Sequence, residues 1–188
     1  GYGSHLGKSA LYVVDLATGA LVKKIVVDEN TTGTPGEIAA GSGLSSPQVV
    51  LNAQYQIEKI YAGDLRGKLW EFDLSGLSST WSGAQLFDAG VGHPITAQPL
   101  VVGHPSGGHL IEFGTGKLSE VTYKVDLTLQ TFYAIWDDAG NNSQVLKSSL
   151  QPQSITNERV INGDKYFTSS TSSVNWSTQK GWYLPLIY

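Results

Sequence analysis

The sequence IYAGDLRGKLWEFDL, at residues 60–74, decides the fold of this chain. Two short runs of aromatic and aliphatic residues flank a connection of small and polar residues that contains Gly63 and Gly67. Runs of this kind around a glycine-containing connection are typical of a β-hairpin. Gly63 and Gly67 supply backbone freedom, and Asp64 is a turn aspartate that accepts hydrogen bonds from its own turn. We therefore expect a hairpin here.

The returning run of this hairpin, residues 69–74, is expected to have two different faces. We expect Leu69 and Phe72 on a buried face, and Trp70 and Asp73 on a face that is only partly wet. A second hairpin is predicted further along the chain, around Asn-Gly at 162–163, which is a strong short hairpin signal.

Parts of the first hairpin recur along the chain. Residues 11–16, LYVVDL, match residues 69–74 in type at almost every position, and residues 132–137, FYAIWD, are a looser copy. Residues 181–186, GWYLPL, are a candidate fourth copy. The intervals, roughly 50–60 residues, lie a little above the blade periods of WD40 and kelch propellers. The sequence thus predicts an all-β fold, a partial β-propeller with quinoprotein-like blades and about four blade equivalents.

Composition agrees with such a fold and excludes several functional classes. The 188 residues form one domain by length, which we take as a single partial propeller over 1–188. Charged residues make up 15% and the net charge is -4, with no basic stripe, so no nucleic-acid partner is expected. No apolar run approaches the roughly 18 residues of a membrane span. The absence of cysteine excludes thiol catalysis and iron–sulfur clusters.

Five segments together resemble the C-terminal propeller of the PilY/PilC family of type IV pilus tip adhesins. They are, in chain order, GSGLSSPQVV, IYAGDLRGKLWEFDL, IEFGTGK, QTFYAIWDD and KGWYLPL. The resemblance implies a non-enzymatic, secreted protein at the pilus tip or the outer-membrane surface of a Gram-negative bacterium. It also implies roles in pilus assembly, in opposing retraction and in attachment to host or abiotic surfaces. Its implied partners are minor pilins or the remainder of the same adhesin.

Many members of that family carry an acid-rich calcium loop just before the IYAGD strand. A calcium loop needs several oxygen ligands at alternating positions and a glycine for its bend. The equivalent connection here, residues 51–59, offers only Asn52 and Glu58 at usable positions. We therefore expect this degenerate loop to bind no calcium and the protein to need no cofactor.

Asp15, Asp73 and Asp137 recur at one repeat position. They can form a ring of acids near an axis, or each can cap the turn after its strand, and we favour the caps. The four histidines match no known metal motif, so no transition-metal site is expected.

The tryptophans divide into two groups. Trp70, Trp136 and Trp182 fall in repeat strands, where we expect them to pack between blades. Trp81 and Trp176 lie in polar loops, where tryptophan is a candidate adhesive contact because interfaces are enriched in this residue.

Two alternatives to a pilus module remain open at this stage. One is a quinoprotein-type dehydrogenase propeller that holds a quinone cofactor, and the other is a carbohydrate-binding surface propeller. An open arc of blades would expose strand edges and apolar faces. We therefore expect the chain to be a segment of a larger propeller, or to close against another chain.

Overall fold

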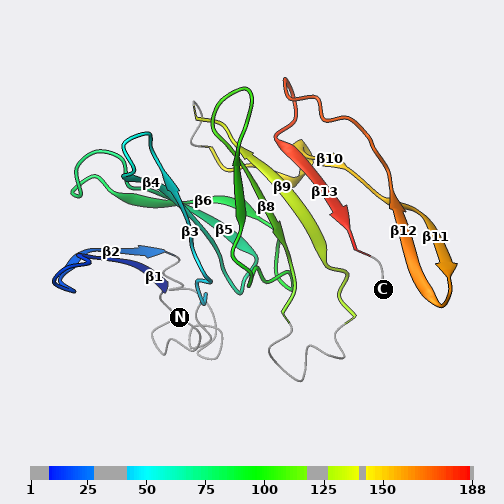
Figure 1. The fold of residues 1–188 in the computed structure, drawn as a ribbon, viewed down its shortest axis with the longest axis horizontal. Helices are drawn as coiled ribbons and strands as arrows, with labels where there is room; N and C mark the ends of the chain where they lie inside the picture. Colours follow the sequence, from blue (N-terminus) through cyan, green and yellow to red (C-terminus); the bar gives the residue numbers. More distant parts are fainter. Residues whose placement is uncertain (1–8, 28–41, 118–126, 140–142, 187–188) are drawn as a thin grey trace.

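The structure is a computed structural model that describes residues 9–27, 42–117, 127–139 and 143–186. Almost all regular structure in these residues is β-strand, arranged as four sheets (Figure 1). No helix in the described part of the chain is long and apolar enough to cross a membrane. The strands are β1 (Ser9–Val14), β2 (Leu21–Val27), β3 (Gln48–Leu51), β4 (Ile57–Gly63), β5 (Lys68–Asp73), β6 (Ser82–Asp88), β7 (Leu100–Gly103), β8 (His109–Gly114), β9 (Thr131–Asp137), β10 (Gln151–Pro152), β11 (Ile155–Ile161), β12 (Asp164–Ser169) and β13 (Gly181–Pro185).

The predicted hairpin is confirmed as β4 and β5, the two inner strands of the antiparallel sheet β3-β4-β5-β6. Asp64 builds its turn: one carboxylate oxygen accepts hydrogen bonds from the backbone N–H groups of Arg66 and Lys68, both at 2.9 Å. The other oxygen accepts from the Trp70 indole N–H at 2.9 Å. The fully buried carboxylate therefore fixes both the turn and the Trp70 side chain of β5.

The expected faces of β5 are corrected by the structure. Successive side chains of a strand point to opposite faces, so Leu69 and Phe72 lie on different faces, and both are fully buried. Leu69 belongs to a cluster shared with β8 and β9, whereas Trp70 and Phe72 belong to a cluster shared with β1 and β2. Neither face of β5 is exposed to solvent, because the sheet β3-β4-β5-β6 is covered by a neighbouring sheet on each side.

A second sheet has the order β10-β13-β9-β8-β7. Its strands β7, β8, β9 and β13 are antiparallel, and the short β10 runs parallel to β13. The assignment of residues 181–186 to a fourth repeat is therefore wrong: β13 pairs with β9 and completes the sheet that β7 begins. Gly181, at a φ of +133°, allows this pairing, because a Cβ there would lie 2.0 Å from the carbonyl oxygen of Ala134.

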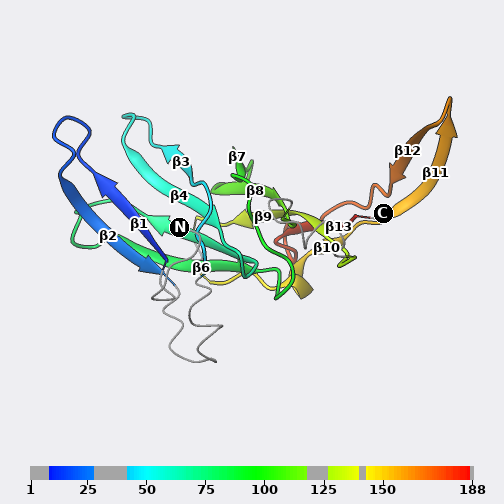
Figure 2. The ribbon, with the colours of Figure 1, turned by 90° about the horizontal axis from the view of Figure 1, so that it is seen from below.

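Three sheets thus follow one another in chain order, packed face to face: β1-β2, then β3 to β6, then the sheet of β7, β8, β9 and β13. Gly63, at the end of β4, lies close against the connection between β6 and β7, since a Cβ there would meet Ile95 Cγ2 at 2.2 Å and the Ile95 carbonyl oxygen at 2.7 Å. The hairpin β11-β12, predicted from Asn162-Gly163, is confirmed, with positive φ at both turn residues. It extends away from the stacked sheets (Figure 2) and is mostly exposed.

Candidate functional site

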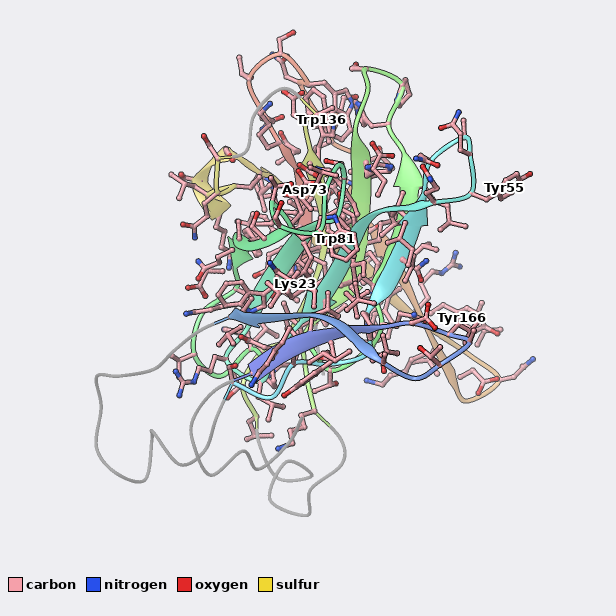
Figure 3. The ribbon with its side chains drawn as sticks, turned by 90° about the vertical axis from the view of Figure 1, so that its left-hand side faces the viewer. Lys23, Tyr55, Asp73, Trp81, Trp136 and Tyr166 are labelled. Carbon is pink, nitrogen blue, oxygen red and sulfur yellow. The ribbon has the colours of Figure 1, made fainter. Side chains whose placement is uncertain are left out.

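A groove opens where the first two sheets meet, at the end that carries the β3–β4 and β5–β6 turns. We call it the Trp81 groove. Its volume is about 380 Å³. It brings together three of the four candidate site residues of the sequence, Asn52, Glu58 and Trp81, and its lining is completed by Val13, Gln56, Ile57, Leu74, Ser75 and Gly76. Figure 3 looks at this side of the molecule, with Trp81 between Asp73 and Lys23 in the view.

Asn52 shapes the rim of the groove. Its side-chain oxygen accepts hydrogen bonds from the backbone N–H groups of Gln54 and Gln56, at 2.9 and 3.0 Å. Its side-chain NH₂ donates to the Gln56 amide oxygen at 3.3 Å, and Tyr55 takes a left-handed backbone conformation with a φ of 60°. Asn52 is thus a turn-building residue whose oxygen is already occupied by the backbone.

Glu58, Gln56 and Ser75 supply the groove's remaining polar atoms. The Glu58 carboxylate has no hydrogen-bond or ion-pair partner among the described residues. The Gln56 NH₂ group keeps its donors, because only its oxygen is engaged. The Ser75 hydroxyl donates to Asp73 at 2.6 Å and retains its acceptor capacity. The groove therefore offers both donors and acceptors to a ligand.

Trp81 is half-buried at the floor of the groove and packs against the apolar cluster of β1, β2, β4 and β5. Its indole N–H is buried and has no acceptor within the part of the chain that the structure describes. The rings of this indole give the groove an apolar wall that packs against the core.

Trp176, the fourth candidate, lies elsewhere. It packs edge-on against Trp136, with ring centroids 5.8 Å apart, and against His104 at 4.4 Å. His104 in turn stacks on Trp136 at 4.4 Å. Trp176 is therefore a half-buried member of an aromatic group at the third sheet, separate from the Trp81 groove.

An ion cluster joins the second and third sheets. The Lys59 ammonium of β4 donates to Glu71 of β5 and to Asp137 of β9, the latter at 2.8 Å. The Tyr61 hydroxyl donates to the same Asp137 oxygen. We call Lys59, Tyr61, Glu71 and Asp137 the Lys59 cluster. Its carboxylates are nearly excluded from water, with side chains 10% and 1% exposed for Glu71 and Asp137.

Burial and mutual charge set the protonation of this cluster. Burial, followed by the charge of Asp137 and its hydrogen bond, raises the pKa of Tyr61 far above its ordinary value, so the phenol stays protonated. Burial also raises the Glu71 pKa, against the opposing hydrogen bond from Lys59. For Lys59, burial lowers the pKa, but the hydrogen bonds and charges of Asp137 and Glu71 outweigh it and leave the pKa raised. The ammonium therefore stays charged between its two acids.

The three recurrent aspartates have two roles. Asp15 accepts from the Thr18 N–H and hydroxyl, at 2.7 and 2.6 Å, and these hydrogen bonds lower its pKa. Asp73 accepts from the Ser75 N–H and hydroxyl in the same way. The prediction of turn caps is confirmed for both, but it is wrong for Asp137, which turns inward to Lys59 and Tyr61 because the neighbouring sheet presents a cation there.

The predicted packing between blades is confirmed for Trp70, which belongs to the cluster shared with β1 and β2. Trp136 is also buried, but it packs against His104 and Trp176 at its own sheet. Among the described residues, no group of three or more His, Asp or Glu is placed to hold a metal ion. Sequence reasoning did not identify Gln56 and Ser75 of the groove, or Lys59 and Glu71 of the cluster. Glu71 did carry a signal, because a charge inside the apolar run 69–72 must find a partner when it is buried.

Stacked antiparallel sheets that follow chain order, each packed face to face on the next, define this protein as a β-propeller. The family described as the PilY1 beta-propeller domain matches residues 1–86. The type IV pilus biogenesis factor PilY1 of Pseudomonas aeruginosa strain PAO1 is 33% identical over 233 aligned residues, which cover 98% of this chain and 19% of that protein. A PilY1 homolog of Xylella fastidiosa strain Temecula1 is 28% identical and is aligned over 100% of this chain and 14% of its own length.

The crystal structure of the Pseudomonas aeruginosa PilY1 C-terminal domain superposes with a TM-score of 0.82 at 31% identity, covering 100% of this chain and 46% of that structure. The chain belongs to the PilY1 β-propeller family, which confirms the family and the fold class expected from the sequence. It spans about a fifth of the length of the Pseudomonas relatives.

Proposed function

We propose that this chain is a non-enzymatic propeller module of a type IV pilus biogenesis factor. The observation that carries the proposal is the alignment of almost the whole chain with proteins named for that function, together with the match to their C-terminal domain. The module supports pilus assembly, opposes pilus retraction and takes part in attachment to host or abiotic surfaces. It acts outside the cell, at the pilus tip or the outer-membrane surface.

The side-chain chemistry is consistent with a binding and assembly role. The buried carboxylates of Asp64, Glu71 and Asp137 are engaged by turn N–H groups, by an indole or by Lys59. These groups therefore act as structural contacts within and between blades. We further propose that the module works without a bound cofactor, and that its partners are minor pilins or other parts of the same protein.

The proposal is tested with the full-length protein in its own bacterium, using two glycine substitutions as a matched pair. Gly63→Ala forces a Cβ against Ile95, which belongs to the apolar cluster between the second and third sheets, and so disturbs the packing of that cluster, whereas Gly103→Ala adds a Cβ to open space. We expect less pilin in sheared surface fractions from the Gly63→Ala strain, and a wild-type amount from the Gly103→Ala strain.

The role in retraction is distinguished from the role in assembly by measuring surface pilin again in strains that lack the retraction motor. We expect surface pilin of the Gly63→Ala strain to recover in that background, because pili that are assembled are no longer withdrawn. The proposed function would be ruled out by two results together: limited proteolysis shows that Gly63→Ala opens the propeller, and surface pilin of that strain is nevertheless normal with the retraction motor present.

A further inference from the structure

We propose that the Trp81 groove is a binding site for a neutral saccharide. The inference deepens the attachment part of the proposed function and rests on it, since it names the chemistry of the surface to which the module attaches. Its evidence is the convergence of Gln56 and Glu58, from the β3–β4 turn and the start of β4, with Ser75 and Trp81 of the β5–β6 connection, in one groove.

The size and floor of the groove suit a sugar. Its volume, about 380 Å³, lies near the small end of the roughly 300–1,000 Å³ of small-molecule sites. There is room for a short saccharide and not for a folded partner. Pyranose rings have an apolar face lined by C–H groups, which packs on an aromatic plate. Trp81 supplies such a plate, and its packing against the core holds the indole in place before any ligand binds.

The polar atoms around Trp81 select hydroxyl groups. A hydroxyl both donates and accepts hydrogen bonds, so one sugar hydroxyl can donate to the unpartnered Glu58 carboxylate while another accepts from the Gln56 NH₂ group. Ser75 adds a further acceptor. An ammonium or guanidinium ligand has only donors and would leave the Gln56 donors unmatched. The pairing of Gln56 with Glu58 therefore favours a polyol over a cationic side chain.

Charge narrows the choice of saccharide. Glu58 is the one charged residue that lines the groove among those the structure describes, and Asp73 lies behind Ser75. Acidic sugars would meet these carboxylates without a compensating Lys or Arg, so binding is expected for neutral sugars and not for uronic or sialic acids.

The test uses the purified full-length protein and three neutral trisaccharides, maltotriose, cellotriose and mannotriose, titrated calorimetrically to millimolar concentration. We expect at least one of them to bind the wild-type protein. Trp81→Ala should weaken binding at least about tenfold, the usual consequence of losing a contact worth about 1.4 kcal/mol. Trp176→Ala, which removes a loop tryptophan outside the groove, should leave the affinity within about threefold of wild type, because separate sites act independently.

Glu58→Ala gives the same test without disturbing the core, since its carboxylate has no partner in the described structure. It should also weaken binding at least about tenfold. The inference is overturned if none of the three sugars binds the wild-type protein, if both groove variants bind as wild type does, or if an arginine-rich peptide binds the groove and the sugars do not. Surface pilin is also measured in the Trp81→Ala strain, and a normal amount together with lost sugar binding supports the inference. If the sugars do not bind, this inference fails, but the proposed function is still tested by the surface pilin of the Gly63→Ala and Gly103→Ala strains.

Discussion

Replacing Lys59 by Met removes the cation of a buried cluster and leaves its two acids behind. Asp137 is 1% exposed and accepts from Lys59 at 2.8 Å, and the Glu71 side chain is 10% exposed. Loss of one partner from such a buried pair costs about 3–5 kcal/mol, because the remaining charge is neither solvated nor paired. At roughly 2–4 °C per kcal/mol for a chain of this size, the melting temperature should fall by roughly 6–20 °C.

Lys165→Met is the matched control for this prediction. Lys165 pairs with Glu158 at 2.7 Å, but the two side chains are 58% and 39% exposed. An exposed pair contributes about 0–1 kcal/mol, so Lys165→Met should lower the free energy of unfolding by no more than about 1 kcal/mol. The measurements are urea unfolding, which gives the free energy of unfolding, and thermal unfolding, which gives the melting temperature, both followed through tryptophan fluorescence.

A rescue variant separates unpaired charge from lost packing. Lys59→Met combined with Glu71→Leu and Asp137→Leu removes all three charges, and it should recover much of the lost stability, because apolar replacement of a buried ion cluster is often neutral or stabilising. If the losses in the free energy of unfolding caused by Lys59→Met and Lys165→Met differ by less than about 1 kcal/mol, the cost of Lys59→Met would match that of an exposed pair, and the assignment of a buried cluster would be refuted.

Gly63→Ala should lower the free energy of unfolding by about 1–3 kcal/mol or more, because a Cβ would overlap Ile95, and Gly103→Ala should change it by less than about 0.5 kcal/mol; equal costs would contradict the close approach. The pKa of Glu71 is raised in the folded protein, so the folded protein holds this proton more tightly than the unfolded chain does. The free energy of unfolding of the wild type, relative to that of Glu71→Gln, should therefore fall as the pH rises from 4.5 through the raised folded pKa. An increase in this difference with pH would contradict a raised pKa. Calorimetric titration with calcium should give no micromolar binding that Glu58→Ala abolishes, because the Asn52 oxygen is held by its own turn. Sedimentation of the isolated chain should show association with a second chain, and a compact monomer that unfolds cooperatively would contradict the predicted open arc.

Local turn chemistry made the first hairpin predictable from sequence. Asp64 and Gly67 act within a few positions of one another: Asp64 is bonded to N–H groups of its own turn, and Gly67 takes a positive φ of 84°. The Asn162-Gly163 hairpin was predictable for the same reason. Such features require no knowledge of distant parts of the chain.

The contacts between sheets were not predictable in this way. Asp137 resembles Asp15 and Asp73 in sequence, yet it bonds to Lys59, 78 residues away. Both faces of β5 are buried because a propeller blade is covered on two sides, a property of the stacking and not of the strand. Residues 181–186 resemble a new repeat because an outer strand has the same apolar pattern as an inner one.

The sequence identified three residues of the Trp81 groove singly, but it did not predict that they come together. Asn52 and Glu58 were selected by the position of a family loop, and Trp81 by its polar neighbours. They converge because the β3–β4 and β5–β6 turns lie at the same end of one antiparallel sheet. The convergence follows from strand order, which the sequence pattern alone does not supply.

The central claim, that this propeller works as part of a type IV pilus, is tested most directly by where the full-length protein is found. Pili are sheared from the cells that produce the protein and separated on a density gradient, and each fraction is probed for pilin and for the propeller. We expect the propeller to band with pilin, and to disappear from those fractions in a strain that makes no pili. A propeller that bands apart from pilin, or that sediments identically with and without pili, would contradict the claim.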